Sequence, residues 1–139
     1  MGFEEYRRRL RTPLVLELHE IAVAARRAGE DPQRAVNREG ADMLALIGRD
    51  DYVVALEIGA KMMNTDQLST WLAERLRAAR PLVLLIGGPD GLAPSCRERA
   101  DQSWSLSPLT LPHGLVRVVV AEQIYRAMSL QAGHPYHRA

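Results

Sequence analysis

The chain has 139 residues, of which 47% are hydrophobic and 25% charged, and its formal net charge is +1. These values are typical of one globular domain, which we expect to span residues 1–139. A single cysteine excludes an internal disulfide and a zinc site built from several cysteines. No apolar run reaches the ~20 residues of a membrane span, and the charged N-terminus lacks the apolar core of a signal peptide. We therefore expect a cytoplasmic protein.

The first third of the chain predicts a helix, a strand and a second helix. Residues 2–11 place acidic side chains before arginines, an order that favours a helix. Residues 14–20 alternate leucine with other side chains, which indicates a strand. Asp31 followed by Pro32 is typical of a helix start, and we expect the helix to run over residues 35–48.

The rest of the chain alternates apolar, β-branched runs with segments of helical spacing. The expected order is a strand at 51–59, a helix at 67–80, a strand at 82–88, a helix at 93–102, a short strand within 105–112 and a helix at 115–130. Strands that alternate with helices predict an α/β fold with a mainly parallel sheet.

A glycine-rich turn follows the strand at 82–88. In open α/β sheets, ligands collect where the strands end, and Gly87, Gly88 and Gly91 would let a ligand touch the backbone there. The spacing matches neither the dinucleotide-binding fingerprint nor a P-loop. On spacing alone, an ordinary strand-to-helix connector is favoured over a ligand loop.

Two further segments and the cysteine leave alternatives open. Pro108 and Pro112 make residues 105–112 a poor central strand, so this segment is either a ligand loop or a surface connection. Residues 134–138 carry two imidazoles, a phenol and a guanidinium, but a frayed terminus is slightly favoured, and two histidines without a carboxylate are a weak metal site. Cys96 stands at an expected helix start, where a half-buried, inert thiol is favoured over a thiolate.

Three segments, LLIGGPDGL, QSWSLSPLTLPHGLVRVVVAEQIYRA and HPYHR, closely resemble the ribosomal RNA large subunit methyltransferase H family. GFEEY near the N-terminus, LEIGAK and the NTDQL helix start also match, so the likeness covers nearly the whole chain. These small proteins of the SPOUT class methylate N3 of a pseudouridine in large-subunit (23S) ribosomal RNA. The resemblance implies an enzyme that uses S-adenosylmethionine, works as a homodimer on rRNA, in our reading on the assembled ribosome, and has a C-terminal trefoil knot.

The resemblance also implies which residues form the site. The cofactor would contact Leu56, Gly88, Ser107, Pro108, Leu109, Thr110, Leu111 and Pro112, largely through the backbone. His137 would accept the N3 proton or orient the nucleotide, Tyr136 would stack on a base, and Arg138 would pair with phosphate. A neighbouring subunit would supply this tail, and no metal is implied.

The start of the chain departs from the family pattern. Relatives have a strand before the GFxEY helix, whereas this sequence begins at Met1 and Gly2, directly at that helix. We expect the first strand to be missing, and favour a misassigned start codon over a shortened chain or a true variant. Loss of that strand leaves an alternative function, a non-catalytic protein that binds RNA or the ribosome.

Overall fold

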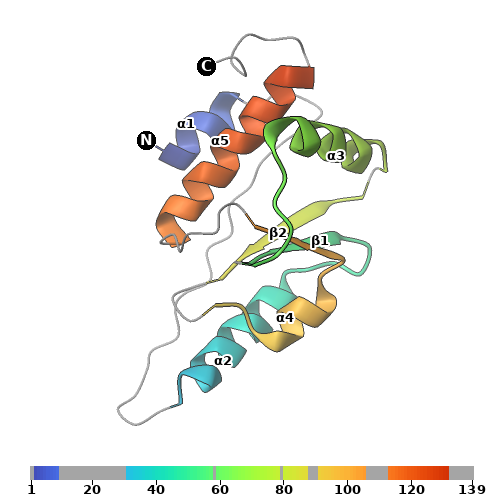
Figure 1. Cartoon of the computed structure of the whole chain (residues 1–139). Coiled ribbons are helices and arrows are strands. Elements are labelled where there is room, and N and C mark those ends of the chain that lie inside the picture. Colours follow the sequence, from blue (N-terminus) through green and yellow to red (C-terminus); the bar gives the residue numbers. More distant parts are fainter. Residues whose placement is uncertain are drawn as a thin grey trace.

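The computed structural model describes residues 2–9, 31–57, 59–78, 80–87, 91–105 and 113–131. In chain order the elements are α1 (Gly2–Arg9), α2 (Pro32–Ala45), β1 (Tyr52–Leu56), α3 (Thr65–Arg77), β2 (Leu82–Ile86), α4 (Pro94–Arg99), β3 (Gln102–Trp104) and α5 (His113–Gln131). Figure 1 shows three layers, with α2 and α4 on one face of the sheet and α1, α3 and α5 on the other.

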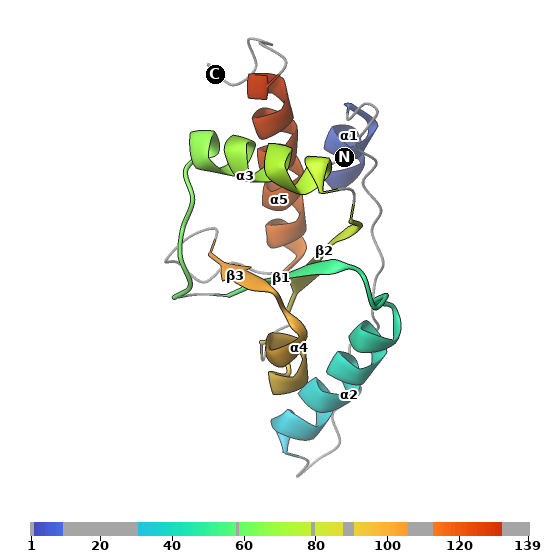
Figure 2. The same ribbon diagram turned by 90° about the vertical axis from the view of Figure 1, so that its right-hand side faces the viewer.

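The three strands form a parallel sheet in the order β2-β1-β3. Strand β1 is central: Val54 pairs with Leu84 on one side and with Gln102 on the other (Figure 2). The predicted α/β fold with a parallel sheet is therefore confirmed. The strand expected at residues 14–20 lies outside the described residues, and the knot and the missing first strand stay predictions.

Side-chain caps begin α2 and α3, as their sequences predict. The Asp31 carboxylate accepts the N–H of Gln33 at 3.0 Å, and Pro32 is the first residue of α2. Asn64 and Gln67 form a reciprocal capping box, each side chain accepting the other's backbone N–H at 2.8 and 2.9 Å. These bonds satisfy N–H groups that a helix start otherwise leaves without a partner.

The end of α2 comes earlier than predicted, at Ala45 instead of Gly48. The Gly48 N–H donates to the Asp51 carboxylate at 2.7 Å, and the Asp51 N–H donates back to the Gly48 carbonyl at 3.2 Å. This turn uses backbone groups that a longer helix would need, so the chain leaves the helix before it.

The helix predicted at 93–102 is also too long. It ends at Arg99, and Gln102 already belongs to β3. Asp101 separates the two elements, because its N–H donates to the Val53 carbonyl at 2.8 Å and its carboxylate accepts the Val53 N–H at 2.9 Å. Most of the range in which a short strand is expected, residues 106–112, lies outside the described residues, and Ser105 forms an isolated bridge with Met62. Strand β3 itself was not predicted.

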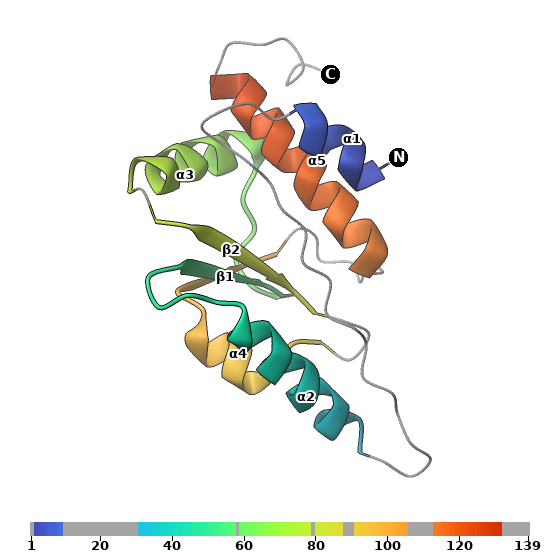
Figure 3. The same cartoon turned by 180° about the vertical axis from the view of Figure 1, so that it is seen from behind.

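The hydrophobic core has two parts, one on each face of the sheet, and β1 contributes to both. Val53 and Ala55 face α2 and α4, whereas Val54 faces α3 and α5, and all three are 0% exposed. The apolar stripe predicted for α3 packs on the α5 side, where Leu68 and Leu72 are buried. Figure 3 shows α1 lying along α5, where the rings of Tyr6 and Tyr125 are 6.1 Å apart.

Candidate active site at the carboxyl edge of the sheet

All three strands end at the same edge of the sheet. Leu56, the last residue of β1, pairs with Ile86 at the end of β2 and with Trp104 at the end of β3. Leu56 is half-buried at this edge. This is the edge at which the sequence predicts a ligand, and Leu56 is the one predicted cofactor residue that the described part of the chain includes.

The segment after β1 is fastened along the end of β3. The Glu57 N–H donates to the Trp104 carbonyl at 3.2 Å, and the Ser105 N–H donates to the Lys61 carbonyl at 2.9 Å. Met62 then pairs with Ser105 in a parallel bridge. The backbone of residues 57–62 is therefore held next to the point where residues 106–112 leave the sheet.

An ion pair joins this segment to α4. The Glu57 carboxylate accepts a hydrogen bond from the Arg97 guanidinium, which projects from the helix after the glycine-rich turn. The pair ties the end of β1 to the element that follows β2. Sequence reasoning missed both residues, although the position of Glu57 directly after a buried strand was a usable signal.

For two of the three glycines in the turn, the fold itself explains why a side chain is excluded. A Cβ on Gly87 would lie 2.8 Å from the Gly91 carbonyl carbon and 2.9 Å from the Leu92 nitrogen, because the turn closes on itself. Gly91 has a φ of 86°, which side chains rarely adopt. The bare backbone at these two positions is therefore required by folding, whether or not a ligand is present.

The other predicted site residues lie outside the described part of the chain. They are Gly88, Ser107, Pro108, Leu109, Thr110, Leu111, Pro112, Tyr136, His137 and Arg138. Their assigned roles stay predictions.

Cys96 is inert, as the sequence favours, but it is buried more deeply than expected. It is 0% exposed, and its thiol lies 3.7 Å from the Gly40 carbonyl, the acceptor of its weak hydrogen bond. Burial raises the pKa of the Cys96 thiol above its ordinary value. The thiol therefore stays protonated at neutral pH and takes no part as a nucleophile.

Within the described ranges, no group of three or more His, Cys, Asp or Glu side chains is placed to hold a metal ion. None of the helices described there combines the length and the apolar character needed to cross a membrane.

Comparison with known proteins identifies the family. Residues 1–137 match the family described as "Predicted SPOUT methyltransferase". The chain belongs to the SPOUT methyltransferase family. It is 53% identical over 138 residues to the ribosomal RNA large subunit methyltransferase H of Alkalilimnicola ehrlichii, and 51% identical over 137 residues to the protein of that name from Methylococcus capsulatus. Each match covers 99% of this chain and 88% of the relative.

These matches confirm the resemblance drawn from the sequence, and the chain is a methyltransferase. They favour the enzyme over the non-catalytic alternative. A methyltransferase needs a place for a methyl donor, and the edge formed by Leu56, Ile86 and Trp104 is where an open parallel sheet provides one.

Proposed function

We propose that this methyltransferase transfers a methyl group from S-adenosylmethionine to N3 of a pseudouridine in 23S ribosomal RNA, and that it acts on the assembled ribosome in the cytoplasm. The observation that carries the proposal is identity of 51–53% over 99% of the chain to proteins named ribosomal RNA large subunit methyltransferase H. Because that name specifies ribosomal RNA of the large subunit, we take this RNA as the substrate class.

The described part of the site is compatible with S-adenosylmethionine. Among the described residues, chain neighbours aside, no atom lies within 4 Å of the position that a Cβ would take on Gly59, so the backbone is open there, just beyond the end of β1. The Glu57 carboxylate, which pairs with Arg97, supplies a negative charge at this end of the strand. When bound, the cofactor supplies an electrophilic methyl group.

We assign the binding of the donor to Leu56, to Gly88 and to residues 107–112. An apolar wall would hold the adenine, while backbone N–H and C=O groups would bind its polar edge. A trefoil knot formed by the C-terminal part of the chain would bring these segments together. Because backbone groups would make most of the contacts to the donor, few charged side chains are needed to bind it.

We assign the acceptor nucleotide to the tail. His137 accepts the N3 proton or orients the ring, Tyr136 stacks on a base, and Arg138 pairs with phosphate. Alignment of N3 with the methyl group is the main catalytic task, because the donor is already activated. The tail of one subunit would complete the site of the other in a homodimer.

The decisive experiment is transfer of labelled methyl from S-adenosylmethionine to assembled ribosomes. We expect label on ribosomes that carry the pseudouridine and none on ribosomes that have uridine at that position. Equal labelling of both would contradict the assignment of pseudouridine as the target. Calorimetry with S-adenosylmethionine alone tests the donor, and absence of measurable binding would contradict its use.

Two substitutions separate the assigned roles. His137→Ala should lower turnover by about 100-fold or more, the scale of general acid–base catalysis, with little change in the calorimetric affinity for the donor. Gly88→Val should do the reverse, because its side chain would block backbone approach to the donor. Similar losses of turnover and affinity in His137→Ala would contradict its role.

A further inference from the structure

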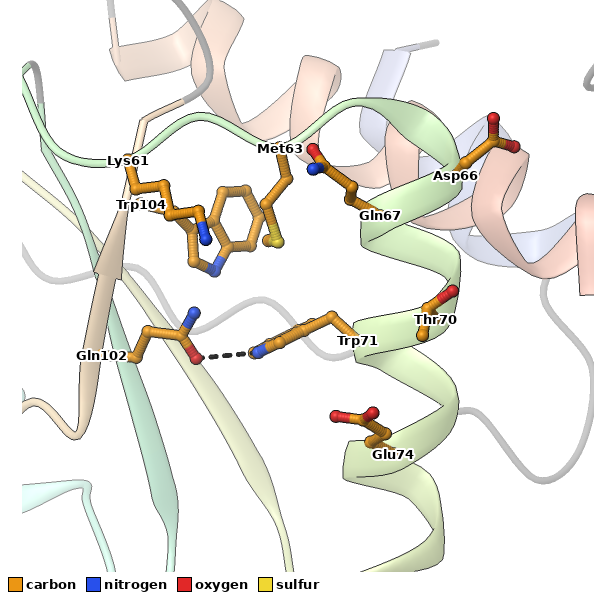
Figure 4. Close-up of a pocket in the computed structure, with 9 residues that line it drawn as sticks. All are labelled: Lys61, Met63, Asp66, Gln67, Thr70, Trp71, Glu74, Gln102 and Trp104. Carbon is orange, nitrogen blue, oxygen red and sulfur yellow. Dashed lines mark hydrogen bonds between the residues drawn. The ribbon is translucent and has the colours of Figure 1, made fainter.

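A second site lies beside the proposed donor site, in a groove between α3 and β3. Its volume is about 400 Å³. It contains none of the residues assigned above to catalysis, and it shares only Trp104 with the edge of the sheet at which the donor is proposed to bind. Its lining consists of Lys61, Met63, Asp66, Gln67, Thr70, Trp71, Glu74, Gln102 and Trp104 (Figure 4).

The first sign of a ligand is a buried hydrogen-bond donor without a partner. Trp104 is only 3% exposed, and its Nε1–H makes no hydrogen bond within the described residues. Figure 4 shows this nitrogen facing the groove. An unsatisfied buried N–H is costly, and each such group in a native structure calls for an acceptor.

The second sign is the orientation of Gln102. Its Oε1 accepts hydrogen bonds from Trp71 Nε1 at 2.7 Å and from the Tyr52 hydroxyl at 3.0 Å. An indole N–H can only donate, so the atom it contacts must be the amide oxygen. The amide nitrogen of Gln102 is therefore turned into the groove, next to Trp104 (Figure 4).

Lys61 completes a cluster of donors. It lines the groove on the strand side, from the segment that follows β1 (Figure 4). Three groups that donate hydrogen bonds, from Lys61, Gln102 and Trp104, thus gather at the strand side of the groove. A ligand that fits there must present acceptor atoms along one edge.

The helix side of the groove sets the charge and shape of that ligand. Asp66 and Glu74 belong to the lining on the α3 side, across the groove from Lys61. Figure 4 shows Asp66 turned away from the groove, so Glu74 is the carboxylate that disfavours a phosphate group there. Met63 and the Trp71 ring border the space between them with apolar surface. A flat, uncharged ring with carbonyl oxygens on one edge meets all of these conditions.

We propose that this groove binds an unstacked uracil-type base of the substrate RNA, distinct from the base that is methylated. The ring lies against Trp71, and its carbonyl oxygens accept from Gln102 and Trp104. Stacking of unpaired bases on aromatic side chains is a common mode of RNA binding. The source of the base rests on the proposed function, whereas the chemistry of the groove does not.

The protein carries its own reporter for this site. The sequence has two tryptophans, and both line the groove. We expect a short oligouridylate to change the tryptophan fluorescence, and an abasic oligomer of equal length to leave it unchanged. Oligocytidylate should bind more weakly, because an amino group replaces one carbonyl. An equal change with the abasic oligomer would overturn the proposal.

Gln102→Glu is the sharpest variant. It keeps an oxygen that accepts from Trp71 and Tyr52, and it replaces the donor that faces the groove by a second acceptor. We expect about tenfold weaker binding of oligouridylate. Gln33→Glu is the matched control, because Gln33 is exposed on α2, on the opposite face of the sheet, and should bind like the wild type. Unchanged affinity in Gln102→Glu would overturn the proposal.

Two further measurements keep the test decisive if Gln102→Glu is destabilised. Lys61→Met keeps the apolar stem of an exposed side chain and should weaken binding several-fold, so equal affinity would count against the site. In NMR spectra, the indole N–H signal of Trp104 should move when the base binds. If neither indole signal moves, water satisfies the donors and the proposal fails.

The source of the base is tested separately. Oligouridylate should bind more tightly than free uridine, since flanking nucleotides add contacts, and equal affinity would overturn the assignment to RNA. None of these measurements uses the methyl donor. Loss of methyl transfer with intact groove binding would therefore contradict the proposed function alone, and intact transfer without groove binding would contradict this inference alone.

Discussion

The two faces of the sheet are covered by different kinds of side chains, although both are built on strand β1. On the face of α2 and α4, small residues pack closely, and a Cβ on Gly40 would lie only 2.5 Å from the Cβ of Ala93. On the face of α3 and α5, Trp71 and Trp104 stand at 76° to each other with ring centroids 5.9 Å apart. Small side chains let two helices meet, whereas two large rings at an angle leave a groove between α3 and β3.

The two faces also differ in the hydrogen bonding of their buried polar groups. On the first face the Cys96 thiol has the Gly40 carbonyl as its acceptor. On the second face the Trp104 N–H is buried without a partner in the described structure. The first face therefore serves mainly folding, while the second carries the groove that we propose as a ligand site.

Gly40→Val should have the largest effect, because it forces α2 away from α4. We expect a loss of about 3 kcal/mol in the free energy of unfolding, measured by denaturant titration. Ala41→Val is the control, since it enlarges the next residue of the same helix at an exposed position and should cost only a few tenths of a kcal/mol. A similar loss of unfolding free energy in both variants would contradict the close packing of α2 against α4.

Gly87→Ala tests whether the turn after β2 is closed by its own backbone. The added methyl group would meet the Gly91 carbonyl carbon at 2.8 Å, so we expect a loss of about 2 kcal/mol in unfolding free energy. Gly48→Ala is the control, because its added methyl group would lie 3.1 Å from the Asp51 carboxylate, a contact that a small shift of this side chain relieves, and we expect a smaller loss. If Gly87→Ala is as stable as the wild type, the turn is looser than described.

Asn64→Ala should cost about 1 kcal/mol, because the capping box at the start of α3 loses the acceptor for the Gln67 N–H. Thermal unfolding measures this loss. Asn37→Ala, in the middle of exposed α2 surface, should cost less. Equal shifts would mean that α3 does not depend on its cap.

The Cys96 thiol gives the smallest effect, and it depends on pH. Its pKa is raised in the folded protein, so this stabilisation is complete below the ordinary value of 9.0 and is lost as the pH rises through the folded pKa. At pH 9.0 we expect a small loss, at most about 0.4 kcal/mol, relative to neutral pH. Cys96→Ala should lack this part of the pH dependence, and identical pH profiles would show that the thiol is not shielded.

Local signals in the sequence predicted most of the fold. Asp31 with Pro32, and Asn64 with Gln67, mark helix starts by bonds within three residues, and the stripe of α3 follows helical spacing. The start of β3 was missed because no glycine or proline ends the helix before it. The bonds that end α4 run from Asp101 to Val53, 48 residues away, and such a contact leaves no local pattern.

The candidate site was predicted only in part, again because contacts between distant segments bring its residues together. The general rule for open α/β sheets predicted the edge of the sheet, the resemblance to a family named Leu56, and Leu56 lies at that edge. The groove was missed because its donors come from the loop after β1 and from β3, with Trp71 on α3 between them. One signal was available: Gln102 and Trp104 are two residues apart on a strand, so they share a face.

The central position of β1 in the sheet also affects how the chain folds while it is being synthesised. Both partners of β1 are made after it, and Asp101, which fastens β3 to it, follows Val53 by 48 residues. At usual synthesis rates that interval is roughly 2 to 10 s. During this time one edge of an apolar strand is open to wrong partners. Correct pairing of β1 in this enzyme, which is itself proposed to modify ribosomes, thus depends on how fast the ribosome synthesises the residues that follow β1.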